Sequence, residues 1–175
     1  MLKSQDVVVL LKLVGRSKGW TFEKVAAELN LSPSAVHRSL DRANHAGLYS
    51  ARQKRVNGPA LFEFLIHGGR YVFPAVREGE SRGVPTAWAA PPLVDRLSSS
   101  GTNAPVWPHP LGRVRGIALE PVHPIVPEAA QRDRRLGELL ALFDAIRIGN
   151  ARERALAAEE LSQRLRLPNS DQLDL

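Results

Sequence analysis

The sequence contains no cysteine, which excludes a disulfide framework, a thiolate metal site and a cysteine nucleophile. Its five histidines are scattered, and none has the spacing to another histidine or a carboxylate that is typical of a metal site. The glycines at 15 and 19 and at 68 and 69 lack the lysine and the strand–loop–helix context of a phosphate-binding loop. We find no catalytic constellation, so we expect neither an enzyme nor a cofactor or metal.

Long apolar runs are also missing. The first run, Val7–Val14, is too short to span a bilayer and has no signal-peptide cleavage pattern. A length of 175 residues permits one domain of fair size or two small ones. We therefore expect a cytoplasmic protein without a membrane partner.

The positive charge is unevenly distributed along the chain. Residues 1–60 hold ten Lys and Arg against four Asp and Glu, whereas 61–130 hold six against six and 131–175 hold eight against eight. The whole net charge of +6 therefore belongs to the first third of the chain. Such clustering is typical of a surface that binds nucleic acid, although chance alone can also produce a difference of this size.

Residues 20–48 have the pattern of two helices joined by a tight turn. Thr21 is a favourable N-cap, and the apolar residues after it recur at helical spacing (Phe22, Val25, Ala26, Leu29). Ser32 caps a second helix that we expect to run to Ala46, with Pro33 at its first position and Gly47 just beyond its end. A short helix, a turn and a second helix of this kind form a helix-turn-helix.

The outer face of the second helix is polar, with Ser34, His37, Arg38, Asp41 and Arg42. These side chains can reach phosphates and base edges in a major groove. Ser32, Ser34 and the backbone at the helix start would bind phosphate through the helix N-terminus. The alternative is that these polar residues form the solvent-exposed face of an ordinary helical hairpin and do not contact DNA.

A strand and a basic turn follow this helix. Leu48–Arg52 predicts the strand, and the turn at 53–59 is rich in positive charge. In a hairpin this turn would be a wing, with Arg52, Lys54 and Arg55 along phosphates or the adjacent minor groove. Residues 60–67 fit a strand or a short helix; we favour a helix that ends at the two glycines 68 and 69, followed by a strand over 70–74.

Residues 4–58 resemble the DNA-binding domain of winged helix-turn-helix transcription regulators of the MarR and IclR kind. The resemblance rests on Trp20-Thr21, Val25-Ala26-Glu28-Leu29, Leu31-Ser32, residues 34–40, Ala46-Gly47-Leu48 and the basic turn. It implies a winged helix-turn-helix domain over 1–74, with Ser34, His37, Arg38 and Arg42 at positions that usually meet DNA. The chain departs from the pattern in its short wing, which runs into the unusual 60–74 segment.

Ten of the thirteen prolines lie between 74 and 127, a spacing that excludes long regular elements. The segment is nevertheless rich in apolar residues, unlike a disordered linker. We therefore expect residues 75–127 to form an extended arm packed on the protein or on a partner, with one strand at 113–119. Trp88 and Trp107 are expected to be its core anchors, and a small-molecule pocket beneath them is the alternative.

Residues 128–175 predict a C-terminal helical hairpin. One helix has an apolar stripe and ends at Gly149, and a second begins at the Asn150–Glu153 capping box and ends at Pro168, before a frayed tail at 169–175. The stripe either completes the core of the first domain or packs against a second subunit. The charged residues around Gly149 are interpreted as surface ion pairs, and a docking patch for a partner protein is the alternative; they are Asp144, Arg147, Arg152, Glu153 and Arg154.

Together these patterns predict a mainly α protein with a small β wing. The function that they favour is a sequence-specific transcriptional regulator, a repressor, that binds double-stranded DNA as a homodimer. The alternative is a protein-interaction module, or an antitoxin-like protein, that grips a protein partner with its arm and C-terminal helices.

Overall fold

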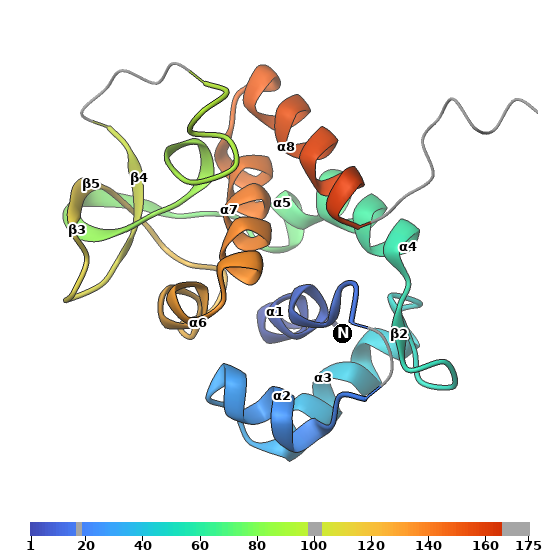
Figure 1. Cartoon of the computed structure of the whole chain (residues 1–175). Helices are drawn as coiled ribbons and strands as arrows, with labels where there is room; N and C mark the ends of the chain where they lie inside the picture. The colour runs from blue at the N-terminus through green and yellow to red at the C-terminus, as the bar shows by residue number, and fades with distance from the viewer. Residues whose placement is uncertain (17–18, 98–102, 166–175) are drawn as a thin grey trace, which may run out of the picture.

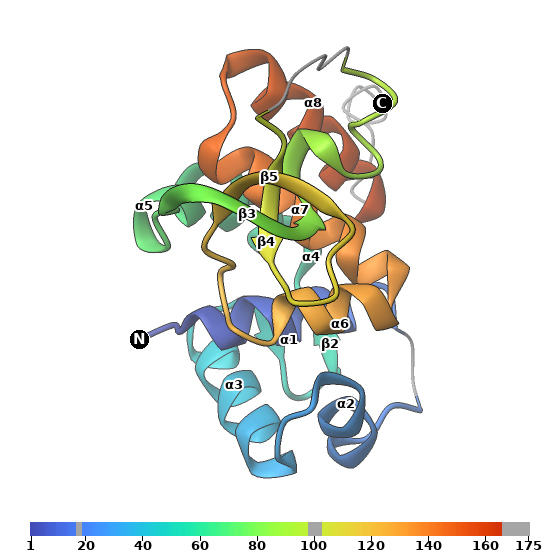
Figure 2. The same cartoon turned by 90° about the vertical axis from the view of Figure 1, so that its left-hand side faces the viewer.

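The computed structural model describes residues 1–16, 19–97 and 103–165. Most of these residues are helical and a smaller part forms two small sheets, which confirms the fold class expected at this coarse level. Figures 1 and 2 show α1 (Ser4–Leu13) in the middle of the molecule. The helices α2 (Phe22–Leu29) and α3 (Pro33–His45) lie on one side of it, and α7 (Arg134–Ile148) lies on the other.

The ends of α2 and α3 are set by the residues that the sequence predicts. Thr21 Oγ1 accepts a hydrogen bond from Lys24 N at 3.2 Å, and Ser32 Oγ accepts one from Ala35 N at 3.1 Å. Gly47 has a φ of +75°, a backbone conformation that favours glycine after a helix. Local hydrogen bonding therefore explains where both helices begin and where α3 ends.

A two-stranded hairpin follows α3. The strands β1 (Tyr49–Ser50) and β2 (Arg55–Val56) are antiparallel, with Tyr49 opposite Val56. The hairpin is very short because each strand has two residues, and its turn holds the basic residues expected for a wing. The second strand lies before residues 60–67, the segment whose sequence fits either a strand or a short helix.

The chain then stays helical up to Val72. The helix α4 (Gly58–Glu63) begins with Asn57 as its cap, continues through a π-helical turn η1 (Phe64–Gly68) and ends as α5 (Gly69–Val72). The expected helix at 60–67 is confirmed, but the stop at the two glycines and the strand over 70–74 are wrong. A Cβ at Gly69 would collide with the ring of Phe143, so this glycine allows close packing on α7.

The proline-rich segment forms a small closed barrel and not an extended arm. Its strands are β3 (Arg77–Pro85), β4 (Pro105–Pro108) and β5 (Val114–Leu119), with the 3-10 turn η2 (Ala87–Ala89) after β3. β3 is antiparallel to both other strands, and β4 and β5 are parallel. The strand expected at 113–119 is confirmed as β5. The prolines at 85, 105 and 108 lie at strand ends, where a missing N–H is tolerated.

The C-terminal hairpin forms as predicted, with one additional break. A short helix α6 (Val126–Arg132) precedes α7, and Asp133 separates them by capping α7 through Leu136 N at 3.1 Å. The helix α8 (Ala151–Arg164) begins at the predicted capping box, in which Asn150 and Glu153 exchange hydrogen bonds of 2.8 and 2.9 Å. The predicted stop at Pro168 and the tail at 169–175 fall outside the described residues.

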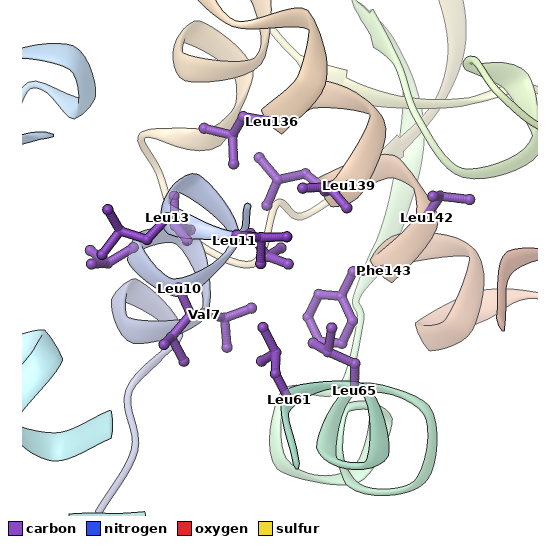
Figure 3. Close-up of a cluster of buried hydrophobic side chains, with 14 of the residues drawn as sticks. Val7, Leu10, Leu11, Leu13, Leu61, Leu65, Leu136, Leu139, Leu142 and Phe143 are labelled. Carbon is purple, nitrogen blue, oxygen red and sulfur yellow. The ribbon is translucent and has the colours of Figure 1, made fainter. Parts of the chain in front are cut away.

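One hydrophobic core joins the N-terminal helices to the C-terminal hairpin. Figure 3 shows α1 side chains meeting those of α4 and η1 (Leu61, Leu65) and of α7 (Leu136, Leu139, Phe143). The stripe on α7 therefore completes the core of the same chain, which decides between the two arrangements left open by the sequence. Trp107 is buried as expected, whereas Trp88 is only partly buried.

Asp144 and Arg147 lie inside the protein, so their interpretation as surface ion pairs is wrong. Asp144 accepts hydrogen bonds from Thr86 Oγ1 at 2.8 Å, Trp107 Nε1 at 2.6 Å and the Arg147 guanidinium at 2.6 Å. Arg147 also donates to the carbonyl oxygens of Phe73 and Pro74 at 2.9 and 3.2 Å. This Asp144 network ties the barrel and the end of α5 to α7.

Candidate nucleic-acid interface

The recognition face proposed from sequence is the side of α3 that faces away from the core. Val36, Leu40 and Ala43 are buried against the other helices. Ser32, Ser34, His37 and Arg38 are exposed, as the sequence predicts. The rings of His37 and Phe22 lie 5.3 Å apart, so α2 supports the imidazole from one side. Four of the predicted contact residues therefore share one accessible surface.

Arg42 is a correction to the predicted contact set, because its guanidinium is engaged inside the protein. Arg42 Nε and a terminal nitrogen donate to the two Asp6 carboxylate oxygens at 2.8 and 2.6 Å. Asp6 is completely buried in α1, and its hydrogen bond raises the pKa of Arg42 above the ordinary value. We therefore assign Arg42 to holding α3 against α1 and not to contacting DNA.

A second polar contact supports the same orientation of α3. Gln5 Nε2 donates to Ser39 Oγ at 2.8 Å and to the Ala35 carbonyl oxygen at 3.4 Å. Ser39 is buried between these groups and also lies 3.3 Å from an Arg42 nitrogen. Two successive residues of α1 thus fix the angle at which α3 presents its outer face. The sequence analysis did not predict the contacts of Gln5 and Asp6 with α3. The available signal was the Asp6 carboxylate within a mostly apolar helix.

The hairpin turn contributes the other predicted contacts. Arg52, Lys54 and Arg55 are exposed, and none of them forms an ion pair within the described ranges. They line a groove of about 1320 Å³ between the hairpin and the segment joining α1 to α2, where Trp20 and Arg16 form the facing wall. The structure therefore brings these three cations together in one groove, while Ser32, Ser34, His37 and Arg38 occupy α3.

Other kinds of site have little support in the part of the chain that the structure describes. No cluster of three histidines or carboxylates there could hold a metal ion. None of the described helices is both long and apolar enough to cross a membrane. Comparisons with protein-family models, with curated proteins and with solved structures found no match to the chain. The candidate site therefore rests on the geometry and charge of α3 and the hairpin.

Replacing Asp6 by Ala should cost about 2–3 kcal/mol of folding free energy, because the Arg42 guanidinium then loses its two charge-assisted hydrogen bonds. The cap at the start of α1 is lost as well, since Asp6 accepts from Lys3 N at 2.8 Å. Urea unfolding measures the loss. Asp41→Ala, which removes an exposed carboxylate from α3, is the matched control and should change stability by less than about 0.5 kcal/mol. Equal midpoints for the two variants would contradict the role assigned to Asp6.

Proposed function

We propose that the protein is a sequence-specific DNA-binding transcriptional regulator, a repressor, with a winged helix-turn-helix formed by α1–α3 and the β1–β2 hairpin. In this proposal α3 enters a major groove and the hairpin is the wing. Ser32 and Ser34 bind phosphate at the start of α3, while His37 and Arg38 reach base edges. Arg52, Lys54 and Arg55 bind the neighbouring backbone and supply affinity that is independent of sequence.

The observation that carries this proposal is the division of α3 into two faces. Its inner face is buried and is held by Asp6 and Gln5 through polar contacts. Its outer face keeps Arg38 exposed and outside any ion pair of the described residues, with the three hairpin cations nearby in sequence and equally exposed. A rigid helix with free polar groups beside a basic hairpin is suited to reading a duplex.

The proposal includes a homodimer. A single module of this kind buries a small area on DNA, and two copies across a two-fold symmetric site double it. Sedimentation of the protein with and without its DNA site would give the number of copies bound.

A fluorescence-anisotropy titration tests the function. The probes are a duplex from the region upstream of the protein's own coding sequence and a scrambled duplex of the same composition, each at two salt concentrations. Tighter binding to the upstream duplex that weakens steeply with salt is expected, because several cations displace counterions from the phosphates. Equal weak binding to both duplexes, or none at low salt, would contradict a sequence-specific regulator.

Arg38→Ala should weaken binding to the upstream duplex by about 1–3 kcal/mol, since a bidentate contact to a guanine edge is lost. The scrambled duplex should be affected less. Arg82→Ala removes an equally exposed arginine from the barrel and serves as the matched control. Both variants are measured by anisotropy at one salt concentration. Unchanged affinity of the Arg38 variant would remove this residue from the interface.

The protein-interaction alternative has lost most of the apolar surface on which it was based; Val94, Leu111 and Val114 of the predicted arm remain exposed. Leu93, Trp107 and Leu119 of the predicted arm are buried in the chain's own core, as is the stripe on α7. An apolar grip on a partner protein would need such side chains to be free. DNA binding is therefore the better supported of the two functions.

A further inference from the structure

Two basic clefts adjoin each other on one side of the protein. The first is the groove between the hairpin and the segment joining α1 to α2, and the second, of about 570 Å³, lies where α1, α2 and the α6–α7 junction meet. Arg16 lines both clefts, so its side chain is common to their walls. Figure 2 shows the end of α1 next to the junction of α6 and α7, which agrees with this arrangement.

The walls of the two clefts carry eight cationic side chains against two carboxylates. The carboxylates, Glu28 and Asp133, are already neutralised within the protein. The buried Lys12 ammonium lies 2.8 Å from Glu28 and 2.6 Å from Asp133, and Arg16 also pairs with Glu28. Burial alone would raise the pKa of Glu28, but the hydrogen bonds from Arg16 and Lys12 outweigh it and the pKa lies below its ordinary value.

Three arginines of the second cleft extend the basic surface away from the hairpin. Arg132, Arg134 and Arg135 surround the start of α7, and all three are exposed. Arg132 pairs with Glu128 and Arg134 with Glu138, both four residues apart along a helix. Both arginines are exposed, although Glu138 is partly covered and also pairs with Arg164. Helix pairs of this spacing contribute a few tenths of a kcal/mol and are screened by salt, so a phosphate can replace the carboxylate.

Arg135 differs from its two neighbours because it has no carboxylate partner among the described residues. Its guanidinium lies against Gly15, at a place where any side chain on residue 15 would collide with it. Gly15 has a φ of +68°, so glycine is also favoured there by the backbone. This packing sets the Arg135 head group beside the α1–α2 segment, between the two clefts.

We propose that the phosphate backbone of the DNA continues from the hairpin over Arg16 to Arg132, Arg134 and Arg135, so that the duplex bends toward the α6–α7 junction. This inference rests on the proposed function and extends it to DNA beyond the segment read by α3. The contacts bind phosphate and carry no base specificity. Smooth bending of a duplex costs about 1–6 kcal/mol, which additional phosphate contacts of this kind can offset.

The test compares the unmodified protein with the triple variant Arg132→Gln, Arg134→Gln, Arg135→Gln on two duplexes. Both contain the bound segment mapped by truncation; one spans about 16 base pairs and the other about 40, enough to continue past one helical turn on each side. Affinity is followed against salt concentration. The matched control, Arg82→Gln, Arg113→Gln, Arg115→Gln, removes three exposed arginines from the barrel.

On the long duplex the junction variant should show a shallower dependence of log K on log salt, by about 0.9 for each lost phosphate contact. It should match the unmodified protein on the short duplex, and the barrel variant should match it on both. An unchanged slope on the long duplex, or equal changes for the two triple variants, would overturn this inference alone. Failure of the unmodified protein to bind either duplex would overturn the proposed function and the inference with it.

Discussion

Asp144→Ala is expected to lower the free energy of unfolding by about 3–5 kcal/mol, which is the usual cost of removing one member of a buried ion pair. The carboxylate accepts from Thr86, Trp107 and Arg147, and none of these donors can reach water easily because all three side chains are buried. Burial raises the pKa of Asp144 above its ordinary value, against the opposing effect of the Arg147 guanidinium. The network thus holds desolvated polar groups that stabilise the fold only when complete.

Urea unfolding followed by tryptophan fluorescence measures this loss, because Trp107 donates directly to Asp144. Asp95→Ala, which removes an exposed carboxylate from the segment after η2, is the control and should change stability by less than about 0.5 kcal/mol. A loss below about 1 kcal/mol for Asp144→Ala would mean that the network contributes no more than an ordinary hydrogen bond.

Gly116→Ala should destabilise the protein by about 3 kcal/mol, at the upper end of what overpacking costs. A Cβ at this position would collide with the carbonyl oxygen of Ala104 and lie 3.0 Å from Val106 Cγ1. The obstruction is the backbone of Ala104, the residue before β4, so it cannot move aside as a flexible side chain would. Relieving the contact would shift the start of β4 away from β5.

Gly79→Ala provides the matched control for this substitution. Gly79 also lies in a barrel strand, but nothing stands within 4 Å of the position that its Cβ would take. Its variant should stay within about 0.5 kcal/mol of the original stability. Thermal unfolding followed by near-ultraviolet circular dichroism compares the two. Equal stability of the two variants would show that the barrel has room that its backbone contacts do not suggest.

Features set by local hydrogen bonding were predictable from sequence. The caps at Thr21 and Ser32 and the capping box at Asn150 involve residues three positions apart, so their geometry follows from a short stretch of chain. The exposed positions of Arg38 and the hairpin cations were predictable for the same reason. Each follows from the phase of one helix or the position of one turn.

Features set by distant partners were missed. Arg42 resembles a surface residue in sequence because its partner Asp6 is 36 positions away. The barrel was missed since the same prolines that exclude long elements also fit the ends of short strands, and pairing between 77–85 and 105–119 has no local signal. Asp144 was interpreted as a surface residue because two of its donors, Thr86 and Trp107, are 58 and 37 positions away along the chain.

The position of α1 has a consequence for the order in which the chain folds during synthesis. This helix is apolar on several faces and its burial requires α7, which is made more than a hundred residues later. At about 5–20 residues per second, α1 is therefore without one of its packing partners for several seconds. We expect the nascent N-terminal segment to depend on chaperones over this interval, and a fragment ending at residue 74 to be prone to aggregation.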